Sequence, residues 1–257
     1  MLTSPFSPDI IGRSRHYLRE QSRSLIDWAG LHKIRAVLYF VGIVLALEYL
    51  SLPNARLADL EKLNPRTTAL ILQRQHEAER EGKAFHVQQS WVPLHRISPH
   101  LLHAVIVSED GTFYEHGGVD WYEVEESIER NFEEGKAARG GSTISQQLAK
   151  NLFLSTSKDP LRKLKELVIA LRMERMLSKQ RILEIYLNVI EWGNGVFGVD
   201  AAARKYFDKP AANITRDEAA RLAAVIPSPL RHQPNQPSQY VERRSLRILE
   251  RMSARGY

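Results

Sequence analysis

The feature that most constrains this chain is an apolar run near its N-terminus. Residues 36–52 carry one charged side chain, Glu48, near the end of the run. A helix of this length is just long enough to cross a bilayer. A buried core helix or a cleaved signal peptide are the alternatives, but Glu48-Tyr49-Leu50 lacks the small residues of a cleavage site. The run therefore predicts a transmembrane helix over 36–52.

The charges before this run predict its orientation. Residues 1–35 contain six basic and three acidic side chains. The basic ones are Arg13, Arg15, Arg19, Arg23, Lys33 and Arg35. By the positive-inside rule, the N-terminus stays in the cytoplasm and everything after Pro53 is exported.

The overall composition excludes several classes of protein. The 257 residues are 43% hydrophobic with a net charge of +6, which fits a folded protein that meets anionic membranes or phosphate-bearing substrates. Cysteine is absent, so disulfides and thiol-metal sites are excluded. No basic strip interleaved with aromatics and no zinc-finger spacing is present, which argues against nucleic-acid binding.

The first candidate site lies where an apolar helix ends. Residues 98–107 predict a buried helix with Ser98 as its N-cap. Glu109 follows at the end of this helix, Asp110 is next, and Gly111 allows a sharp exit. A carboxylate in that position is suited to proton transfer. The alternative is that both acids are simply solvated residues at a helix end.

A second candidate site begins at residues 140–143, where two glycines precede Ser142 and Thr143. Either hydroxyl can cap the helix that follows, and Lys136 and Arg139 stand just before it. Backbone N–H groups at a helix start, hydroxyls and cations together bind phosphate-like anions. An ordinary capped helix after a loop is the alternative.

A third pattern lies on the helix that Asp159 and Pro160 open. Arg162 and Lys163 stand four and three residues before Glu166, so both cations can face its carboxylate. A surface ion pair is the alternative. The buried side of this helix is predicted to hold Leu161, Leu164, Leu167, Val168, Leu171 and Leu177.

The rest of the chain is predicted to be almost entirely helical. Capping boxes at Asp120 and Thr215 each begin a helix, and the helix after Thr215 stops before Pro227. Further helices are expected over 57–63, 67–80, 179–188 and a last basic segment. In 179–188, Glu184 and Tyr186 suit either core or site. The glycine-rich stretch 193–198 suits close packing or a sugar lying against the backbone.

Four segments together resemble the signatures of a known family. They are Glu109-Asp110-x-x-Phe113-x-x-His116-x-Gly118, Gly141-Ser142-Thr143-Ile144-Ser145-Gln146-Gln147-Leu148-Ala149-Lys150-Asn151, Arg162-Lys163-x-x-Glu166 and the segment 179–188. In this order the segments resemble those of the monofunctional peptidoglycan glycosyltransferases of glycosyltransferase family 51. The resemblance covers roughly 92–229.

The resemblance implies the reaction and the residues that carry it. A lipid-linked disaccharide, lipid II, is polymerised into linear β-1,4 glycan strands with inversion and release of undecaprenyl pyrophosphate. The implied catalytic residues are Glu109, as general base, and Glu166, which positions the leaving group. Asp110 is implied as a neighbour that hydrogen-bonds or tunes Glu109, and His116 as a residue that shapes the loop. The implied substrate-binding residues are Asp110, Phe113, His116, Ser142, Thr143, Gln146, Gln147, Lys150, Asn151, Arg162 and Lys163.

The resemblance also implies the fold and the setting. We expect a mainly α, lysozyme-like domain over 53–257, with a small mobile lobe near the membrane and one preceding transmembrane helix. This domain would be periplasmic and residues 1–35 cytoplasmic, in the cell inner membrane. No tightly bound cofactor is implied, although Mg²⁺ or Mn²⁺ can bridge Glu166 and the pyrophosphate. Expected partners are lipid II, the growing strand, the membrane and cell-wall synthesis or division proteins.

Two other functions remain open from the sequence. A peptidoglycan-cleaving lysozyme-like enzyme also needs an acidic residue after a helix. Cations for a pyrophosphate would have no use in such an enzyme. A catalytically inactive scaffold for cell division is the other, and intact Glu109 and Glu166 count against it.

Overall fold

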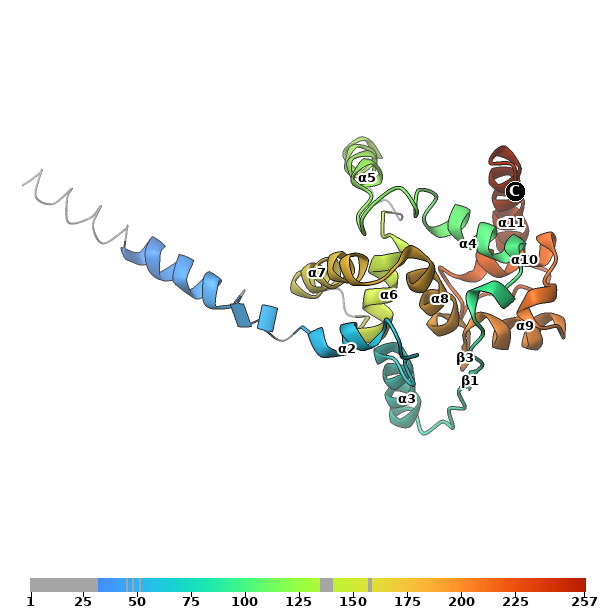
Figure 1. The fold of residues 1–257 in the computed structure, drawn as a ribbon, viewed down its shortest axis with the longest axis horizontal. Coiled ribbons are helices and arrows are strands. Elements are labelled where there is room, and N and C mark those ends of the chain that lie inside the picture. The colour runs from blue at the N-terminus through green and yellow to red at the C-terminus, as the bar shows by residue number, and fades with distance from the viewer. Residues whose placement is uncertain (1–31, 45, 48, 51, 135–140, 157–158) are drawn as a thin grey trace, which may run out of the picture. The chain divides into compact units, whose positions relative to one another are not determined.

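The computed structural model describes residues 32–257, apart from 45, 48, 51, 135–140 and 157–158 (Figure 1). The chain divides into two compact units, Met1–Leu52 and Pro53–Tyr257. Lys136 and Arg139, expected beside the second candidate site, lie outside the described residues.

In the first unit, residues 32–44 are helical, as are 46–47 and 49–50. Large apolar side chains on this segment are exposed, among them Phe40 and Leu50. Across the described positions, no helix has both the length and the hydropathy that a membrane crossing requires. The transmembrane helix expected over 36–52 includes 45, 48 and 51, which lie outside the described residues, as does most of the basic segment 1–35. Both stay predictions.

The second unit is built from helices with one small sheet (Figure 1). Its elements are α2 (Asn54–Asp59), α3 (Ala69–Arg80), β1 (Gln88–Gln89), the 3-10 helix η1 (Leu94–Arg96), α4 (Pro99–Glu109), α5 (Trp121–Glu134), α6 (Ile144–Phe153), α7 (Pro160–Met176), α8 (Lys179–Val189), β2 (Glu191–Gly193), β3 (Val196–Phe197), α9 (Val199–Phe207), the 3-10 helix η2 (Ala211–Asn213), α10 (Arg216–Val225) and α11 (Gln239–Ala254). The mainly helical fold expected from the sequence is confirmed.

Local capping explains where several helices begin. Thr143 and Thr215 each form a full capping box with the residue three positions on, Gln146 and Glu218. Asp159 accepts a hydrogen bond from the N–H of Leu161 and so caps α7, with Pro160 in the first turn. The helix starts predicted from Thr143, Asp159 and Thr215 are therefore confirmed.

Helix α4 forms the centre of the packing that positions the first candidate site. Its residues Leu101, Ala104 and Val105 are completely buried. It packs against α10 and α11, which follow it by more than a hundred residues in the chain (Figure 1). The expected N-cap, Ser98, makes no side-chain bond to the first turn of α4 and instead donates to the carbonyl of Ile214. Ser98 thus ties the start of α4 to the segment before α10.

Helix α6 connects the second candidate site to its neighbours. It packs against α3, α7 and α8. Ile144, Leu148 and Ala149 are completely buried on it. The polar residues that precede and follow these positions are thereby held at fixed places between α4 and α7.

The buried side of α7 differs from the prediction. Glu166, Ile169, Ala170 and Met173 are the buried residues of this helix. They recur at the spacing of one helix face. Leu161 and Leu164, expected inside, are 44% and 43% exposed. Leu177 is buried as predicted, but the positions of Leu161 and Leu164 were predicted wrongly. The prediction placed only apolar residues on the buried side, whereas two paired cations allow the carboxylate of Glu166 to face inward.

A sheet absent from the sequence prediction joins the helices at one edge. Its strand order is β1-β3-β2, with β1 parallel and β2 antiparallel to β3. Glycines between β2 and β3 and directly after β3 allow other parts of the backbone to approach closely. A Cβ on Gly195 would lie 2.3 Å from the carbonyl oxygen of His86, and one on Gly198 would lie 2.7 Å from that of Asn188. Of the two roles considered for this stretch, close packing is the one observed.

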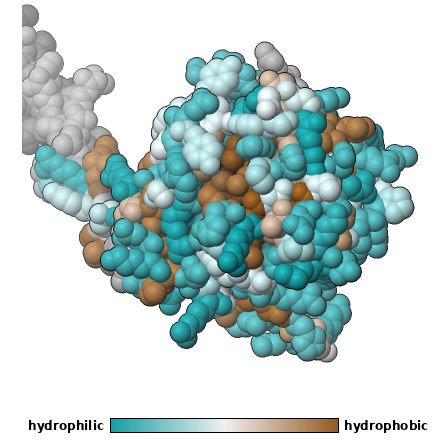
Figure 2. Space-filling view, turned by 45° about the vertical axis from the view of Figure 1, so that its right-hand side comes forward, coloured by the Kyte–Doolittle hydropathy of each residue, from teal (hydrophilic) through white to brown (hydrophobic). Residues whose placement is uncertain are grey.

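The surface of the second unit is largely hydrophilic with local apolar areas. Figure 2 shows hydrophobic side chains near the centre of one face, bordered by hydrophilic ones. The two most exposed aromatic residues of this unit's described part are Trp121 and Tyr122, each 69% exposed at the start of α5. Isolated exposed side chains are common, but adjacent exposed aromatics mark a surface suited to amphipathic contacts.

Candidate functional site

Glu109 is the last residue of α4, and its side chain is 9% exposed. Its Oε2 accepts a hydrogen bond from Nε2 of Gln147 at 3.0 Å. Its Oε1 accepts longer ones from Ser108 at 3.2 Å and from Arg244 at 3.3 Å. The hydrogen-bond donors to this nearly buried carboxylate therefore come from three helices, since Ser108 lies on α4, Gln147 on α6 and Arg244 on α11.

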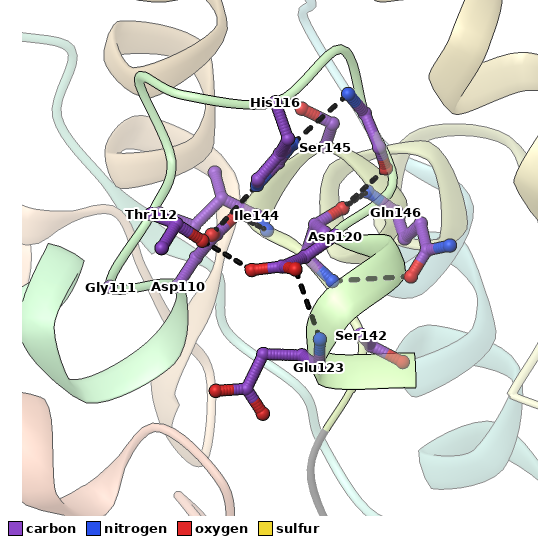
Figure 3. A network of polar contacts seen from close by, with 12 residues as sticks. Asp110, Gly111, Thr112, His116, Asp120, Glu123, Ser142, Ile144, Ser145 and Gln146 are labelled. Carbon is purple, nitrogen blue, oxygen red and sulfur yellow. Dashed lines mark hydrogen bonds and ion pairs between the residues drawn. The ribbon is translucent and has the colours of Figure 1, made fainter. Parts of the chain in front are cut away.

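Asp110 anchors the loop after α4 and the start of the next motif. Its Oδ1 contacts Nε2 of His116 at 2.8 Å, and its Oδ2 accepts from the N–H of Ile144 at 2.9 Å (Figure 3). The N–H of Gly118 donates to Nδ1 of His116, so Nε2 carries the ring proton and donates to Asp110. The expected role of Asp110 beside Glu109 has no hydrogen bond to support it.

A second contact closes the same loop. Thr112 donates from Oγ1 to Asp120, whose other oxygen accepts from the N–H of Glu123 at the start of α5 (Figure 3). The chain leaves α4 directly after Glu109 and turns from Gly111 on, and Gly111 does so without a positive φ. A Cβ there would lie 2.8 Å from a guanidinium nitrogen of Arg255. A larger residue at 111 would therefore require the end of the exposed Arg255 side chain to move.

Phe113 belongs to the core beneath the loop. It is completely buried, and the ammonium of Lys179 lies 4.4 Å from the centre of its ring. Lys179 also pairs with Glu174 at 2.8 Å, and Glu174 accepts a hydrogen bond from Ser145 on α6. The side chain of Phe113, expected to contact substrate, therefore lies in the core and stabilises the loop by packing there.

Thr143 and Gln146 make their side-chain hydrogen bonds within the fold. Thr143 donates to the carbonyl of Gly118 at 2.8 Å and accepts from the N–H of Gln146 at 3.2 Å. The amide oxygen of Gln146 accepts from the N–H of Thr143 at 3.1 Å. Both residues are buried. They hold the start of α6 against the first loop, and Asn151, also buried, lies further along the same helix.

Glu166 is a buried carboxylate held by two cations. Arg162 donates to its Oε2 at 2.6 Å, and Lys163 donates to its Oε1. The side chain of Glu166 is 3% exposed, whereas that of Lys163 is 48% exposed. The ion pair is therefore not the solvated pair of the alternative interpretation. Because the carboxylate is buried, removal of either cation would leave part of its charge uncompensated.

A chain of hydrogen bonds connects the two glutamates. Gln147, which donates to Glu109, also lies 3.4 Å from the carbonyl oxygen of Ser142. The hydroxyl of Ser142 accepts from Nζ of Lys163 at 3.1 Å. Lys163 donates to Glu166. Both glutamates are described residues, and no hydrogen bond joins them directly. They lie at opposite ends of one continuous polar network.

Lys150 lies within electrostatic reach of both glutamates. Burial is the largest influence and lowers the pKa of the Lys150 ammonium. Repulsion by Lys163 and Arg162 lowers this pKa further, whereas attraction by Glu166 and, more weakly, by Glu109 raises it. The net pKa is below that of an exposed lysine. We call Lys150, Arg162 and Lys163 the cation cluster. Its three charges, against the one carboxylate of Glu166, leave an excess of positive charge for an anion.

The segment 179–188 supplies both core and site residues. Glu184 accepts from the N–H of Leu94 at 2.9 Å and pairs with Arg181, so it joins α8 to η1. The amide of Asn188 bonds both backbone groups of Val92 at 2.8 Å. Tyr186 is completely buried, but its hydroxyl reaches Oε1 of Gln147 at 2.9 Å. Of the two residues left open by the sequence, Tyr186 touches the site and Glu184 is structural.

The sequence reasoning missed the arginines of α11 and of its C-cap position. Arg244 contacts Glu109 and Ser108, Arg251 reaches the carbonyl of Val107 at 3.4 Å, and Arg255 donates to the carbonyl of Gly111. Cations at the C-terminal end of α4 are favoured by its dipole. The signal was a stripe of arginines at spacings of three and four in the last basic helix.

Residues 76–253 match the family model described as Transglycosylase. A biosynthetic peptidoglycan transglycosylase of Nitrosospira multiformis is 41% identical over 86% of this chain and 95% of the relative. Proteins of the same name from Dechloromonas aromatica and Aromatoleum aromaticum are 46% and 49% identical, over 75% and 66% of this chain and 83% and 74% of theirs.

Proposed function

Because this chain belongs to the transglycosylase family and is a peptidoglycan glycosyltransferase, we propose that it polymerises lipid II into linear β-1,4-linked glycan strands. Undecaprenyl pyrophosphate is the leaving group. The observation that carries the proposal is the network from Glu109 through Gln147, Ser142 and Lys163 to Glu166. It supports a site with a base at one end and cations at the other.

Glu109 is the proposed general base. The 4-hydroxyl of the acceptor sugar transfers its proton to this carboxylate while its oxygen attacks the anomeric carbon of the donor. A positioned base typically contributes roughly 10²–10⁴-fold to such a step. The α-linked donor gives a β-linked product, so the displacement inverts the anomeric carbon and needs no covalent intermediate.

The cation cluster is proposed to bind the departing pyrophosphate. As the bond between the anomeric carbon and the phosphate oxygen breaks, negative charge grows on the leaving group, and cations placed there in advance stabilise it. Lys163 supports this role because it is half exposed although it pairs with Glu166. Glu166 is proposed to hold Arg162 and Lys163 in place.

A divalent cation at the pyrophosphate stays a prediction. In the described part of the chain, no group of three or more His, Cys, Asp or Glu side chains is placed to hold a metal ion. Both oxygens of Glu166 accept from cationic side chains. The residues present therefore do not form a metal site by themselves. Mg²⁺ or Mn²⁺ would need most of its ligands from phosphate oxygens and water.

The setting is proposed to be the bacterial inner membrane. Residues 36–52 would anchor the chain and Pro53–Tyr257 would be periplasmic. A substrate with a lipid tail is confined to the bilayer, so an anchor raises its effective concentration near the site. A reporter that is active only in the cytoplasm, fused after Tyr257, should be silent. A strong cytoplasmic signal would overturn the orientation.

Incubation of the detergent-solubilised protein with lipid II, and separately with purified sacculi, tests the activity. We expect glycan polymer from lipid II and no fragments from sacculi. Glu109→Gln should fold normally and lose polymerisation by at least about 10²-fold. Fragments from sacculi would indicate a glycan-cleaving enzyme, and activity on neither substrate would indicate a scaffold. Near-normal turnover of Glu109→Gln would place the base elsewhere.

A further inference from the structure

Buried Tyr186 and partly buried Gln147 stand behind Glu109, and neither takes part in the proton transfer proposed above. Tyr186 donates a hydrogen bond to Oε1 of Gln147 at 2.9 Å, and Gln147 donates from Nε2 to Oε2 of Glu109 at 3.0 Å. The three residues come from α8, α6 and α4. They form a line from the protein interior to the proposed base.

The chemistry of each group fixes the direction of these bonds. The carboxylate of Glu109 and the carbonyl of Ser142 are both acceptors, and both lie on the Nε2 side of Gln147. Rotating the amide by half a turn would place its oxygen against two other oxygens. The hydroxyl of Tyr186 must then donate to Oε1, because that atom can only accept. Only one arrangement of the amide satisfies all of its neighbours.

The proton of Tyr186 is retained over the range in which enzymes work. Complete burial raises the pKa of its hydroxyl far above the ordinary value, and the nearby charges of Glu109 and Asp110 add to this effect. The donor at the interior end therefore does not titrate with the base that it supports.

The donors around Glu109 also determine which part of the carboxylate is left for substrate. Among the described residues, Oε1 accepts from Ser108 and Arg244, whereas Oε2 accepts from Gln147. A carboxylate has about four acceptor positions, two on each oxygen. One acceptor position on Oε2 therefore remains.

We propose that Tyr186 and Gln147 act as a positioning relay that holds Glu109 in its reactive rotamer and directs the remaining acceptor position of Oε2 toward the acceptor hydroxyl. Gln147 is then a positioning residue rather than a ligand of the pyrophosphate. Tyr186, which does not touch substrate, acts on the reaction through Gln147. This inference rests on the proposed role of Glu109 as the base.

Tyr186→Phe tests the relay because it removes one hydroxyl and keeps the ring. We expect kcat with lipid II to fall about tenfold, the rate equivalent of one lost hydrogen bond, with KM changed less than about twofold. The acid limb of the pH–rate profile should move to higher pH, since a loosened Gln147 donates less well to the ionised carboxylate. Gln147→Met, which removes the amide, should shift the profile in the same direction and further.

Tyr206→Phe is the matched control. Tyr206, on α9, is also buried, and its hydroxyl donates to the carbonyl of Trp192 at 3.1 Å rather than to Gln147. Its substitution should lower Tm as much as Tyr186→Phe does and leave the pH–rate profile unchanged. Adding Tyr186→Phe to Gln147→Met should have little further effect, because the relay is already broken.

Two results would overturn the relay. An unchanged pH–rate profile in Tyr186→Phe would make the tyrosine merely structural. A raised KM with unchanged kcat in Gln147→Met would mean that the amide binds substrate directly. Either result, obtained while Glu109→Gln is inactive, rejects the relay alone. An active Glu109→Gln would reject the proposed base, and with it the relay.

Discussion

The carboxylate of Asp110 accepts a 2.9 Å hydrogen bond from the backbone N–H of Ile144, thirty-four residues further along the chain. One side chain thus joins the loop after α4 to the start of α6. The same carboxylate holds the ring of His116. Asp110 is therefore a structural link between the first two sequence motifs, and Glu109 beside it is free to face the polar network.

The first prediction tests this link. Asp110→Ala leaves the N–H groups of Ile144 and His116 without their acceptor, and burial of unpaired donors costs about 3 kcal/mol. We expect a drop in Tm of roughly 10 °C. Asp59→Ala, at an exposed position in α2, should change stability by less than about 0.5 kcal/mol. An Asp110→Ala protein that melts normally but is inactive would place Asp110 in the reaction itself.

The order and type of the helices could be predicted because their signals are local. Capping residues and prolines mark the starts of α6, α7 and α10, and apolar periodicity marks α8. The buried face of α7 could not be predicted. Whether Glu166 points inward depends on packing against α6, and no property of residues 160–176 alone encodes it.

Local sequence patterns could not predict the hydrogen-bond partners of Glu109 either. Gln147 and Arg244 lie thirty-eight and one hundred and thirty-five residues after it in the chain. The order of the motifs indicated which residues form a site. Which of them hydrogen-bond to Glu109 depends on how α4, α6 and α11 pack against one another. The same holds for the strands around Gly198, which are two or three residues long and have no periodicity to detect.

The second prediction concerns that glycine. Gly198 has φ 81°, and a Cβ there would lie 2.7 Å from the carbonyl oxygen of Asn188, whereas Gly82 has φ 64° and open space. Gly82→Ala should cost about 1 kcal/mol from backbone strain alone. Gly198→Ala should cost at least about 3 kcal/mol, because overpacking is added to the strain. Urea titrations of both variants measure the difference, and equal costs would contradict the close approach.

The third prediction separates two adjacent arginines of α11. Arg244 contacts Glu109, whereas the side chain of Arg243 is exposed and bonds to Gln239 of its own helix. Arg244→Ala should lower kcat about tenfold through the loss of a charge-assisted hydrogen bond to the base. Arg243→Ala should leave kcat unchanged. Comparable losses in both variants would mean that α11 contributes general positive charge rather than a specific contact.

The last prediction follows from the lowered pKa of Lys150. Burial favours the neutral amine, so this lysine loses its proton at a lower pH than an exposed lysine does. A bound anion reverses the preference, because it favours the charged form. Binding of inorganic pyrophosphate to the whole protein should therefore weaken as pH rises through the pKa of Lys150, and near that pH it should take up protons.

Isothermal titration in buffers of different ionisation heat measures both the affinity and the protons taken up. In Lys150→Arg the pyrophosphate affinity should no longer fall as pH rises over this range, because a guanidinium stays charged throughout it. In Lys163→Arg the affinity should still fall as pH rises, since Lys150 is still present. If Lys150→Arg instead lowers the pyrophosphate affinity equally at every pH, the size and shape of the lysine side chain matter for binding and its titration does not, which contradicts the prediction. A pH dependence retained in Lys150→Arg but lost in Lys163→Arg would assign the titrating cation to Lys163.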